Sequence, residues 1–191
     1  MLQFATVTSP IHTVKEQVEV AINAGCRWIR LTGTPDDATV EEVIPVCRDN
    51  DVILILDNNT ELVDRLRIHG LHLTSWTRGS VIEAREKLGP HAILGVTCAD
   101  SSLAGELTGL DVDYMVIQAP ADGNLVNFYI LFMETLKSLK TGIHPVASGN
   151  IPVDLYPSVI ATGIEGIEIS GAILDAPDPS SFITLALDTL K

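Results

Sequence analysis

Short apolar, β-branched runs alternate with longer amphipathic segments along the whole chain. This alternation is typical of βα units on a parallel sheet. Eight strands are expected at Leu2–Val7, Arg27–Leu31, Val52–Leu56, Gly70–Leu73, Ala92–Val96, Tyr114–Ile117, His144–Ala147 and Gly166–Ile169. Eight helices are expected at about Thr13–Ala24, Thr39–Arg48, Thr60–Ile68, Val81–Leu88, Ser101–Leu107, Asn127–Leu139, Asp154–Ala161 and Pro179–Leu190.

The count of these segments favours an α/β fold, a single-domain (β/α)₈ TIM barrel over residues 1–191, with an open doubly wound sheet as the alternative. Several strand-like runs are almost wholly apolar, as expected of strands that helices cover on both faces. No linker, charge run or shift in composition divides the chain. We therefore expect no internal domain boundary.

Net charge excludes two classes of partner. Twelve Lys and Arg against 25 Asp and Glu leave a net charge of −13, which repels nucleic acid and anionic lipid surfaces. The start of the chain has no basic segment before an apolar one, and no apolar run is long enough for a membrane span. The apolar content of 46 % is high enough for an exposed apolar surface that two copies of the chain could bury in a homodimer.

The cysteines suggest a reducing compartment. Cys26, Cys47 and Cys98 are odd in number and show no CxxC spacing, which argues against a disulfide framework or a zinc site. We expect a cytoplasmic protein in which Cys26 and Cys47 are buried. Cys98 follows the fifth strand, where its thiol could be partly exposed, but no His is close in sequence to activate it.

In a βα barrel, reactive groups lie at the C-terminal ends of the strands. Two small, Gly-containing loops follow the last two expected strands, and such loops commonly present backbone N–H groups to a phosphate. Ser148, Gly149, Asn150, Ser170 and Gly171 are therefore candidate phosphate-binding residues. The alternative is that both loops are ordinary tight turns.

Arg30, Asp57 and Asn58 form the second candidate group, because adjacent strands would bring them together at the barrel mouth. Arg30 could contact an anion or a diphosphate, and Asp57 with Asn58 could hold a metal or the substrate. The alternative is a structural ion pair that plugs the barrel. His72 lies between Leu71 and Leu73, so it is expected to face inward, as a satisfied core histidine or as a base.

Three further polar residues complete the candidate site. Thr97 ends the fifth strand and joins Arg30, Asp57 and Asn58 as a candidate catalytic residue. Thr32 and Gln118, at the ends of the second and sixth strands, are expected to line the substrate pocket together with His72.

Several of these segments, in one order, resemble the thiamine phosphate synthase family, with thiazole tautomerase as a relative of similar fold. The segments that carry the resemblance are Ile29-Arg30-Leu31, Ile53–Leu62, Gly70-Leu71-His72-Leu73, Ile93–Thr97, Val146–Ile151 and Gly163–Ile173. The resemblance covers nearly the whole chain. It implies a (β/α)₈ barrel that joins a hydroxymethylpyrimidine diphosphate to a thiazole phosphate with Mg²⁺ and releases pyrophosphate.

Residue by residue, the resemblance is incomplete. The family's Gln-x-Arg-x-Lys reads Arg30-Leu31-Thr32-Gly33-Thr34, and its Asn-Asp pair reads Asp57-Asn58. Its second metal-binding Asp falls on Thr77, Thr97 replaces a Ser, and the tautomerase histidine falls on Ala99. The Thr-x-Thr-Lys phosphate loop is replaced by residues 118–124, whereas Ser170 and Gly171 keep the final phosphate site.

Two function classes follow for this chain. The first is a thiamine phosphate synthase-like transferase that acts on a small phosphorylated heterocycle, with several of the family's active-site residues replaced. The second is a non-catalytic homologue that binds a phosphorylated ligand. An enzyme for another small phosphorylated compound, such as a phosphosugar epimerase, has less support because paired inward carboxylates on the second and eighth strands are not apparent.

Overall fold

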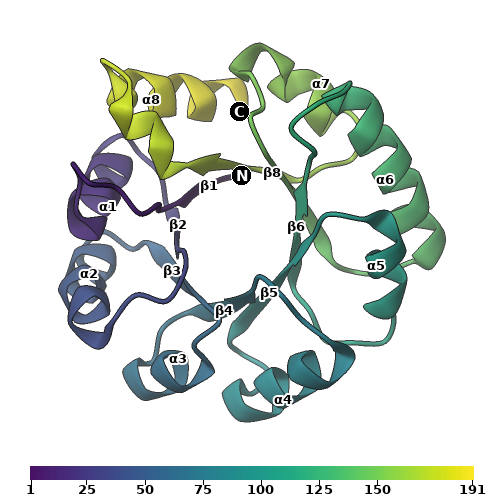
Figure 1. Ribbon diagram of the computed structural model, residues 1–191, viewed down its shortest axis with the longest axis horizontal. Helices are drawn as coiled ribbons and strands as arrows, with labels where there is room; N and C mark the ends of the chain where they lie inside the picture. Colours follow the sequence, from purple (N-terminus) through teal and green to yellow (C-terminus); the bar gives the residue numbers. More distant parts are fainter.

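A computed structural model describes all residues from Met1 to Lys191 and shows a closed parallel barrel whose strands pair in chain order. Figure 1 looks along the barrel, with the strands inside and the helices around them. The strands are β1 Leu2–Ala5, β2 Trp28–Leu31, β3 Ile53–Asp57, β4 Gly70–Leu73, β5 Ile93–Cys98, β6 Tyr114–Gln118, β7 His144–Ser148 and β8 Gly166–Ser170. Pairing of β1 with β8 closes the barrel, so the open sheet is excluded and the predicted (β/α)₈ barrel is confirmed.

Helices follow the strands as an outer ring. They are α1 Val14–Asn23, α2 Asp37–Asp49, α3 Thr60–Leu66, α4 Arg78–Leu88, α5 Ser101–Glu106, α6 Leu125–Leu139, α7 Tyr156–Ile160 and α8 Pro179–Thr189. Most begin at a capping side chain that accepts a backbone N–H, as Asp36 does for α2 and Asp178 for α8. These caps fix where each loop at the barrel mouth ends.

Two short 3₁₀ helices were not expected from the sequence. η1, Val153–Leu155, replaces the first turn of the helix expected from Asp154, and α7 continues it. Pro157 lies in the first turn of α7, where its missing N–H costs nothing, so an α-helix can begin there. η2, Gly171–Asp175, follows β8 directly and fixes the loop that carries Ser170.

The apolar core has two parts on opposite faces of the sheet. The larger contains 45 buried residues between the strands and the surrounding helices. The smaller lies inside the barrel and consists of Tyr114, Val116 and Val146, with Trp28 and Ile93 packed against it. Residues paired across parallel strands face the same side, so the register places Arg30, Asp57, His72, Thr97 and Glu168 on the inward face as well.

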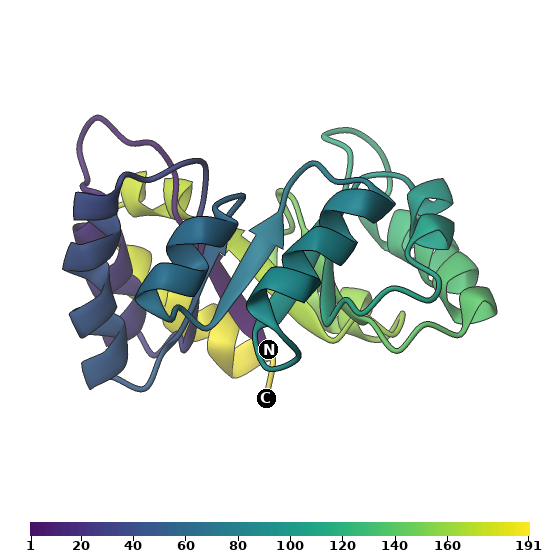
Figure 2. The same cartoon turned by 90° about the horizontal axis from the view of Figure 1, so that it is seen from below.

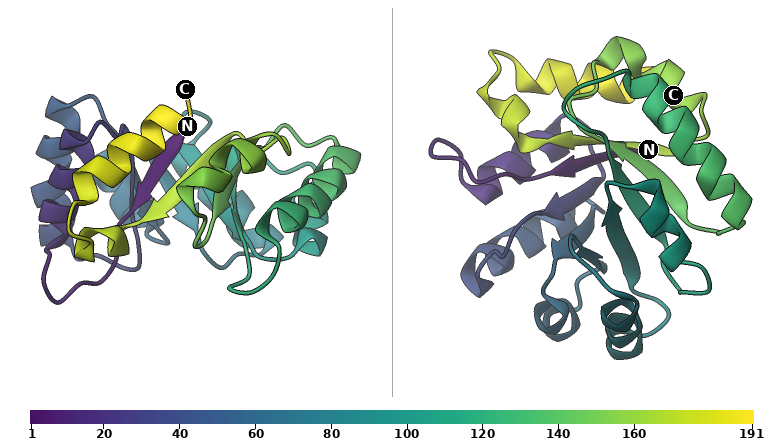
Figure 3. Two further views of the ribbon diagram at one scale, coloured as in Figure 1. Left: turned by 90° about the horizontal axis from the view of Figure 1, so that it is seen from above. Right: turned by 45° about the vertical axis from the view of Figure 1, so that its right-hand side comes forward.

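The barrel has a clear polarity. In Figure 2 both termini lie at one end, and the loops that follow the strands lie at the other. The two views in Figure 3 show the same helical layer outside the strands from other directions. We call the end that carries the loops after the strands the barrel mouth. No helix of the structure is both long and apolar enough to cross a membrane.

Glycine makes room for Tyr114, the largest fully buried side chain inside the barrel. A Cβ atom on Gly95 would lie 2.1 Å from two ring carbons of Tyr114. Tyr114 is 2 % exposed and reaches from the neighbouring strand across the position that a side chain at residue 95 would fill. Its hydroxyl is thereby carried up to His72, just below the mouth.

Candidate functional site

Arg30 on β2 lies between two carboxylates of the barrel interior, Asp57 on the neighbouring β3 and Glu168 on β8. Its Nη1 atom donates to Glu168 Oε2 at 2.7 Å. Its Nε atom is 3.2 Å from Asp57 Oδ1, within ion-pair distance but not aligned for a hydrogen bond. Exposure is 8 % for Arg30, 1 % for Asp57 and 7 % for Glu168. We call these three residues the buried charge cluster.

The second oxygen of each carboxylate also has a partner. Asp57 Oδ2 accepts from the Gly33 amide at 3.2 Å, which ties the end of β3 to the loop after β2. Glu168 Oε1 accepts from the Ser148 hydroxyl at 2.9 Å, which ties β8 to β7. The buried charge cluster thus connects β2, β3, β7 and β8 at the mouth.

Burial governs the titration of these groups. Desolvation raises the pKa of Asp57 to about 6, although the nearby Arg30 charge and the Gly33 amide act in the opposite direction. Desolvation also raises the pKa of Glu168, against the effects of Arg30 and the Ser148 hydroxyl. With both carboxyls ionised the cluster carries a net charge of −1, and with one protonated it is neutral.

His72 is enclosed by three polar partners. Its Nδ1 atom lies 2.9 Å from the Tyr114 hydroxyl, and its Nε2 atom lies 2.7 Å from Thr97 Oγ1 and 3.4 Å from Arg30 Nη1. Desolvation and the charge of Arg30 hold its pKa well below the usual value, so the ring stays neutral. A neutral ring that accepts at Nε2 donates from Nδ1 to Tyr114. The predicted inward orientation is confirmed, and the contacts fit a satisfied core histidine.

Asn58 is not grouped with Asp57, although the two are adjacent in sequence. Its side chain donates to Thr74 Oγ1 at 2.8 Å and accepts from the Thr74 amide at 3.0 Å. Its backbone is left-handed, with φ at 55°, a conformation that Asn tolerates better than most residues. Asn58 therefore links the loops after β3 and β4, whereas Asp57 points into the barrel.

The loop after β7 is anchored on one side and open on the other. The Ser148 carbonyl accepts from the Tyr129 hydroxyl at 2.8 Å and from the Ala119 amide at 2.9 Å. Gly149 has φ at +135°, which favours glycine, and neither its amide nor that of Asn150 donates a hydrogen bond within the protein. Gly149 and Asn150 are both exposed.

The loop after β8 is equally constrained. Ser170 is exposed, and its hydroxyl accepts from the Ala172 amide at 3.2 Å. A Cβ atom on Gly171 would lie 2.5 Å from Gln17 Oε1, so only glycine fits there without a shift. Ser148 and Ser170 are held near each other because Glu168, which binds Ser148, lies two residues before Ser170 on the same face of β8.

Thr32 and Gln118 lie at the mouth but on opposite sides of it. Thr32 borders a cavity of about 510 Å³ between the loops after β1 and β2, which Thr6 and His12 also line. The Thr32 amide and hydroxyl both bond to Thr6, so this residue joins the two loops. Gln118 is exposed at the end of β6, opposite Ser148 in the register with β7.

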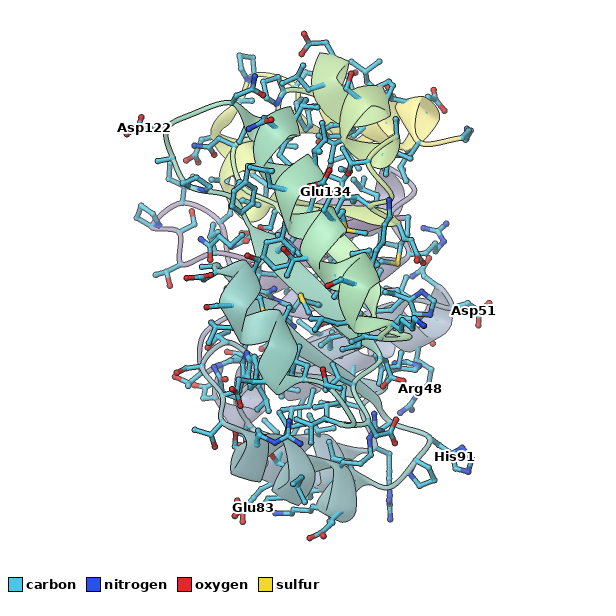
Figure 4. The ribbon with its side chains drawn as sticks, turned by 90° about the vertical axis from the view of Figure 1, so that its right-hand side faces the viewer. Arg48, Asp51, Glu83, His91, Asp122 and Glu134 are labelled. Atoms are coloured by element: carbon cyan, nitrogen blue, oxygen red, sulfur yellow. The ribbon has the colours of Figure 1, made fainter.

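The eight loops that follow the strands contain no Lys or Arg. They contain five aspartates: Asp36, Asp100, Asp122, Asp175 and Asp178. In Figure 4, Asp122 lies at one end of the molecule, and Arg48 and His91 lie toward the opposite side. The guanidinium of Arg30 is therefore the one Lys or Arg group at the strand ends, and two carboxylates already bind it. His12 and Lys15 line the cavity between the loops after β1 and β2.

These residues do not fit a magnesium ion. Mg²⁺ needs oxygen ligands at about 2.0–2.1 Å, usually one or two carboxylates with phosphates and waters, but one Asp57 oxygen faces Arg30 and the other accepts from Gly33. At about 4 Å and an effective dielectric constant near 20, a divalent ion would repel the guanidinium by roughly 8 kcal/mol. Thr77, at the position of the second metal-binding Asp in the resemblance, caps α4 through the Ser80 amide.

Sequence reasoning missed Glu168 and misjudged Cys98. Glu168 is the one charged residue of Gly-Ile-Glu-Ile-Ser, and a lone charge in an otherwise apolar strand was a readable signal. The barrel holds two inward carboxylates, Asp57 on β3 and Glu168 on β8, whereas β2 carries Arg30, so the second and eighth strands do not form a carboxylate pair. Cys98 is not partly exposed: it is fully buried on the outer face of β5, and burial raises its thiol pKa to about 12.

Comparison with known proteins agrees with this architecture. The sequence profile of the family described as "Thiamine monophosphate synthase" matches residues 4–173. The thiamine-phosphate synthase of Bacteroides fragilis (strain YCH46) is 30 % identical over 194 residues, which cover 93 % of this chain and 94 % of the relative. The corresponding protein of Bacteroides thetaiotaomicron is 29 % identical and covers 94 % and 92 %.

Solved structures show the same fold. The thiamine phosphate pyrophosphorylase from Pyrococcus furiosus superposes with a TM-score of 0.79 at 20 % identity, over 99 % of this chain and 94 % of the other. A 3-hexulose-6-phosphate synthase superposes with a TM-score of 0.78 at 18 % identity, over 100 % and 99 %. With the profile match over most of its length and relatives at this level of identity, the chain belongs to the thiamine monophosphate synthase family.

Proposed function

We propose that this protein binds a phosphorylated heterocycle of thiamine biosynthesis, of the thiazole phosphate class, at the barrel mouth. The phosphate is held by Ser148, Gly149 and Asn150 after β7 and by Ser170 and Gly171 after β8. The observation that carries this proposal is the turn at Gly149, which is anchored by two bonds to the Ser148 carbonyl and leaves two backbone amides without acceptors. Backbone amides in such turns are suited to anions.

The ring of the ligand would lie over the inward face, next to Glu168, Arg30 and Thr97. The Ser170 hydroxyl and the two free amides of Gly149 and Asn150 give uncharged donors, which suit a single phosphate group, whereas the Ser148 hydroxyl donates to Glu168. The nearest charge, Glu168, is already bound by Arg30 and Ser148, so its repulsion of the phosphate is reduced.

Calorimetric titration tests this proposal directly. The protein is titrated with thiazole phosphate and, separately, with the same thiazole alcohol without its phosphate. We expect saturable binding of the phosphate ester and at least tenfold weaker binding of the alcohol. Equal affinities, or no binding of either compound, would contradict the proposal.

A charge variant then locates the phosphate. Asn150→Asp places a carboxylate beside the two free amides and should weaken binding of the phosphate ester at least tenfold. Asn124→Asp is the matched control, since it makes the same exchange in the neighbouring loop, where Asp remains a good cap for α6. The control should bind like the unmodified protein.

The joining reaction is measured separately. Thiazole phosphate is mixed with hydroxymethylpyrimidine diphosphate, with and without Mg²⁺, and thiamine phosphate and released pyrophosphate are quantified. Product formed at a rate comparable to that of a family synthase assayed in parallel would assign the transferase function. Binding without product would assign the non-catalytic class.

We also propose a cytoplasmic location and a homodimer, each with its own check. The three cysteines are free and buried, which supports a reducing compartment. Ile130 and Leu131 on α6 are 41 % and 56 % exposed, which supports an apolar face between two copies. Cell fractionation and analytical ultracentrifugation measure the two properties, and a monomer at micromolar concentration would contradict the second.

A further inference from the structure

We infer that Arg30 is the built-in counter-cation of this site in place of a divalent metal ion, so that the site takes a single phosphate group without Mg²⁺ and does not take a metal-bound diphosphate. This inference rests on the proposed function for the identity of its ligand. The claim that Arg30 takes the place of a metal ion does not depend on that function and rests on the buried charge cluster.

The Arg30 guanidinium lies where a bound metal ion would be expected, between two buried carboxylates. Arg30 reaches Glu168 at 2.7 Å and Asp57 at 3.2 Å, and it is 8 % exposed. A cation that bridges two buried carboxylates is the role that a metal ion plays in many sites. Here a covalently attached cation already occupies that role, and it stays paired because an unpaired buried charge is costly.

The carboxylate that the resemblance would assign to a metal has a hydrogen bond at one oxygen and an ion-pair contact, without a hydrogen bond, at the other. Asp57 Oδ2 accepts from the Gly33 amide, and Oδ1 faces Arg30 Nε. No group of three or more His, Cys, Asp or Glu side chains is arranged to hold a metal ion anywhere in the chain. A metal at Asp57 would have to displace Arg30, and Glu168 would then lose its partner.

The loops provide an independent observation. A diphosphate carries more negative charge than a phosphate monoester and needs cations or a metal to hold it. The eight loops after the strands offer five aspartates and no Lys or Arg, and Arg30 is committed to the buried charge cluster. A single phosphate can be held by the uncharged donors after β7 and β8, whereas the loops offer no Lys or Arg to neutralise the second phosphate of a diphosphate.

The first experiment needs only the native protein and one variant. MnCl₂, as a paramagnetic substitute for Mg²⁺, is titrated into the native protein and into Asp57→Asn, and water-proton relaxation reports bound metal. We expect identical titrations, since weak binding to surface carboxylates is common to both. A saturable Mn²⁺ site that Asp57→Asn abolishes would overturn the inference.

The second experiment removes the guanidinium. Arg30→Gln leaves Asp57 and Glu168 facing each other without a cation, and we expect its Mn²⁺ affinity to rise at least tenfold. Adding Asp57→Asn to this variant should abolish the gain. Arg85→Gln is the matched control: Arg85 is also largely buried and bound to two carboxylates, Asp111 and Asp113, but at the opposite end of the barrel.

Circular dichroism must show that Arg30→Gln is folded. If it is not, the comparison of the native protein with Asp57→Asn still decides whether Arg30 takes the place of a metal ion. A folded Arg30→Gln protein with unchanged Mn²⁺ affinity would also count against the inference.

The third experiment addresses the ligand. Thiazole phosphate and inorganic pyrophosphate are each titrated in EDTA and in excess Mg²⁺. We expect thiazole phosphate affinity to be the same in both and pyrophosphate to gain nothing from Mg²⁺. A tenfold gain for either ligand would overturn the inference. If thiazole phosphate binds in neither condition, the proposed function fails. The Mn²⁺ titrations still test whether Arg30 takes the place of a divalent metal ion.

Discussion

Arg30 on β2 and Glu168 on β8 form a 2.7 Å ion pair although β1 lies between their strands. The intervening position is Ala5, which pairs in register with Arg30 on one side and with Ser170 on the other. Because alanine is small, the guanidinium can pass over it to reach β8. Through this contact, between residues far apart in the sequence, Arg30 neutralises the Glu168 carboxylate in the barrel interior.

Removal of Glu168 should destabilise the protein more than removal of a surface glutamate. Glu168→Ala leaves Arg30 with Asp57 alone and leaves the Ser148 hydroxyl without its acceptor, so we expect a loss of about 3 kcal/mol in the free energy of unfolding. Urea denaturation measures this. Glu165→Ala, which breaks an exposed pair with His144, should cost no more than about 1 kcal/mol. Equal losses in the two variants would show that the buried Arg30–Glu168 pair stabilises the protein no more than the exposed pair does.

Asp57 should make the protein less stable as pH rises from about 4 to about 6. Its pKa in the folded protein is raised from the ordinary value of 3.8 to about 6, so the folded state holds the proton more tightly than the unfolded state does. Stability from this group is therefore greatest below about pH 4 and is lost as pH rises through 6, by roughly 3 kcal/mol. Urea denaturation of the native protein and Asp57→Asn, at matched pH values, should show this difference between them, and parallel pH profiles would contradict it.

Gly95 should tolerate no side chain. Gly95→Ala would place a methyl group 2.1 Å from the Tyr114 ring, and Tyr114 is enclosed by the barrel and bound to His72. We expect a loss of about 1–3 kcal/mol in stability from overpacking. Gly105→Ala, in α5 with open space around the added atom, should instead be neutral or stabilising by about 0.5–1 kcal/mol. Thermal unfolding of both variants provides the comparison.

The three cysteines should be inert toward a thiol reagent in the folded protein. Burial raises the thiol pKa of Cys47 and of Cys98 to about 12 and also raises that of Cys26, so the thiolate that reacts is scarce. Ellman's reagent at pH 8 should modify the three thiols only after denaturation. Rapid modification of one thiol in the native protein would identify a local opening around it.

The fold could be predicted from local pattern alone. Apolar runs such as residues 52–56 and amphipathic segments such as residues 127–139 alternate without interruption, and each strand found in the structure overlaps its expected range. Element ends were less predictable, because they depend on caps and turns. The helix expected from Asp154 begins as a 3₁₀ turn, and the fifth strand extends to Cys98.

The candidate site was predictable only in part. Position at the strand ends identified Arg30, Asp57, His72, Thr97 and the serine loops as residues of the mouth, and the structure places them there. Sequence proximity was misleading for Asn58, whose side chain pairs with Thr74 rather than lying beside Asp57. Whether the predicted residues bind phosphate stays a prediction.

By itself, the sequence determined the βα alternation, the barrel, the acidic character of the chain and its family. The tertiary structure alone decided which charges meet, because the closure of β8 onto β1 brings Glu168 to Arg30. Hydrophobic periodicity is a local property that each segment carries in its own residues. An ion pair across a barrel depends on strand register and on the size of the side chain between its partners, and neither is written in the neighbouring sequence.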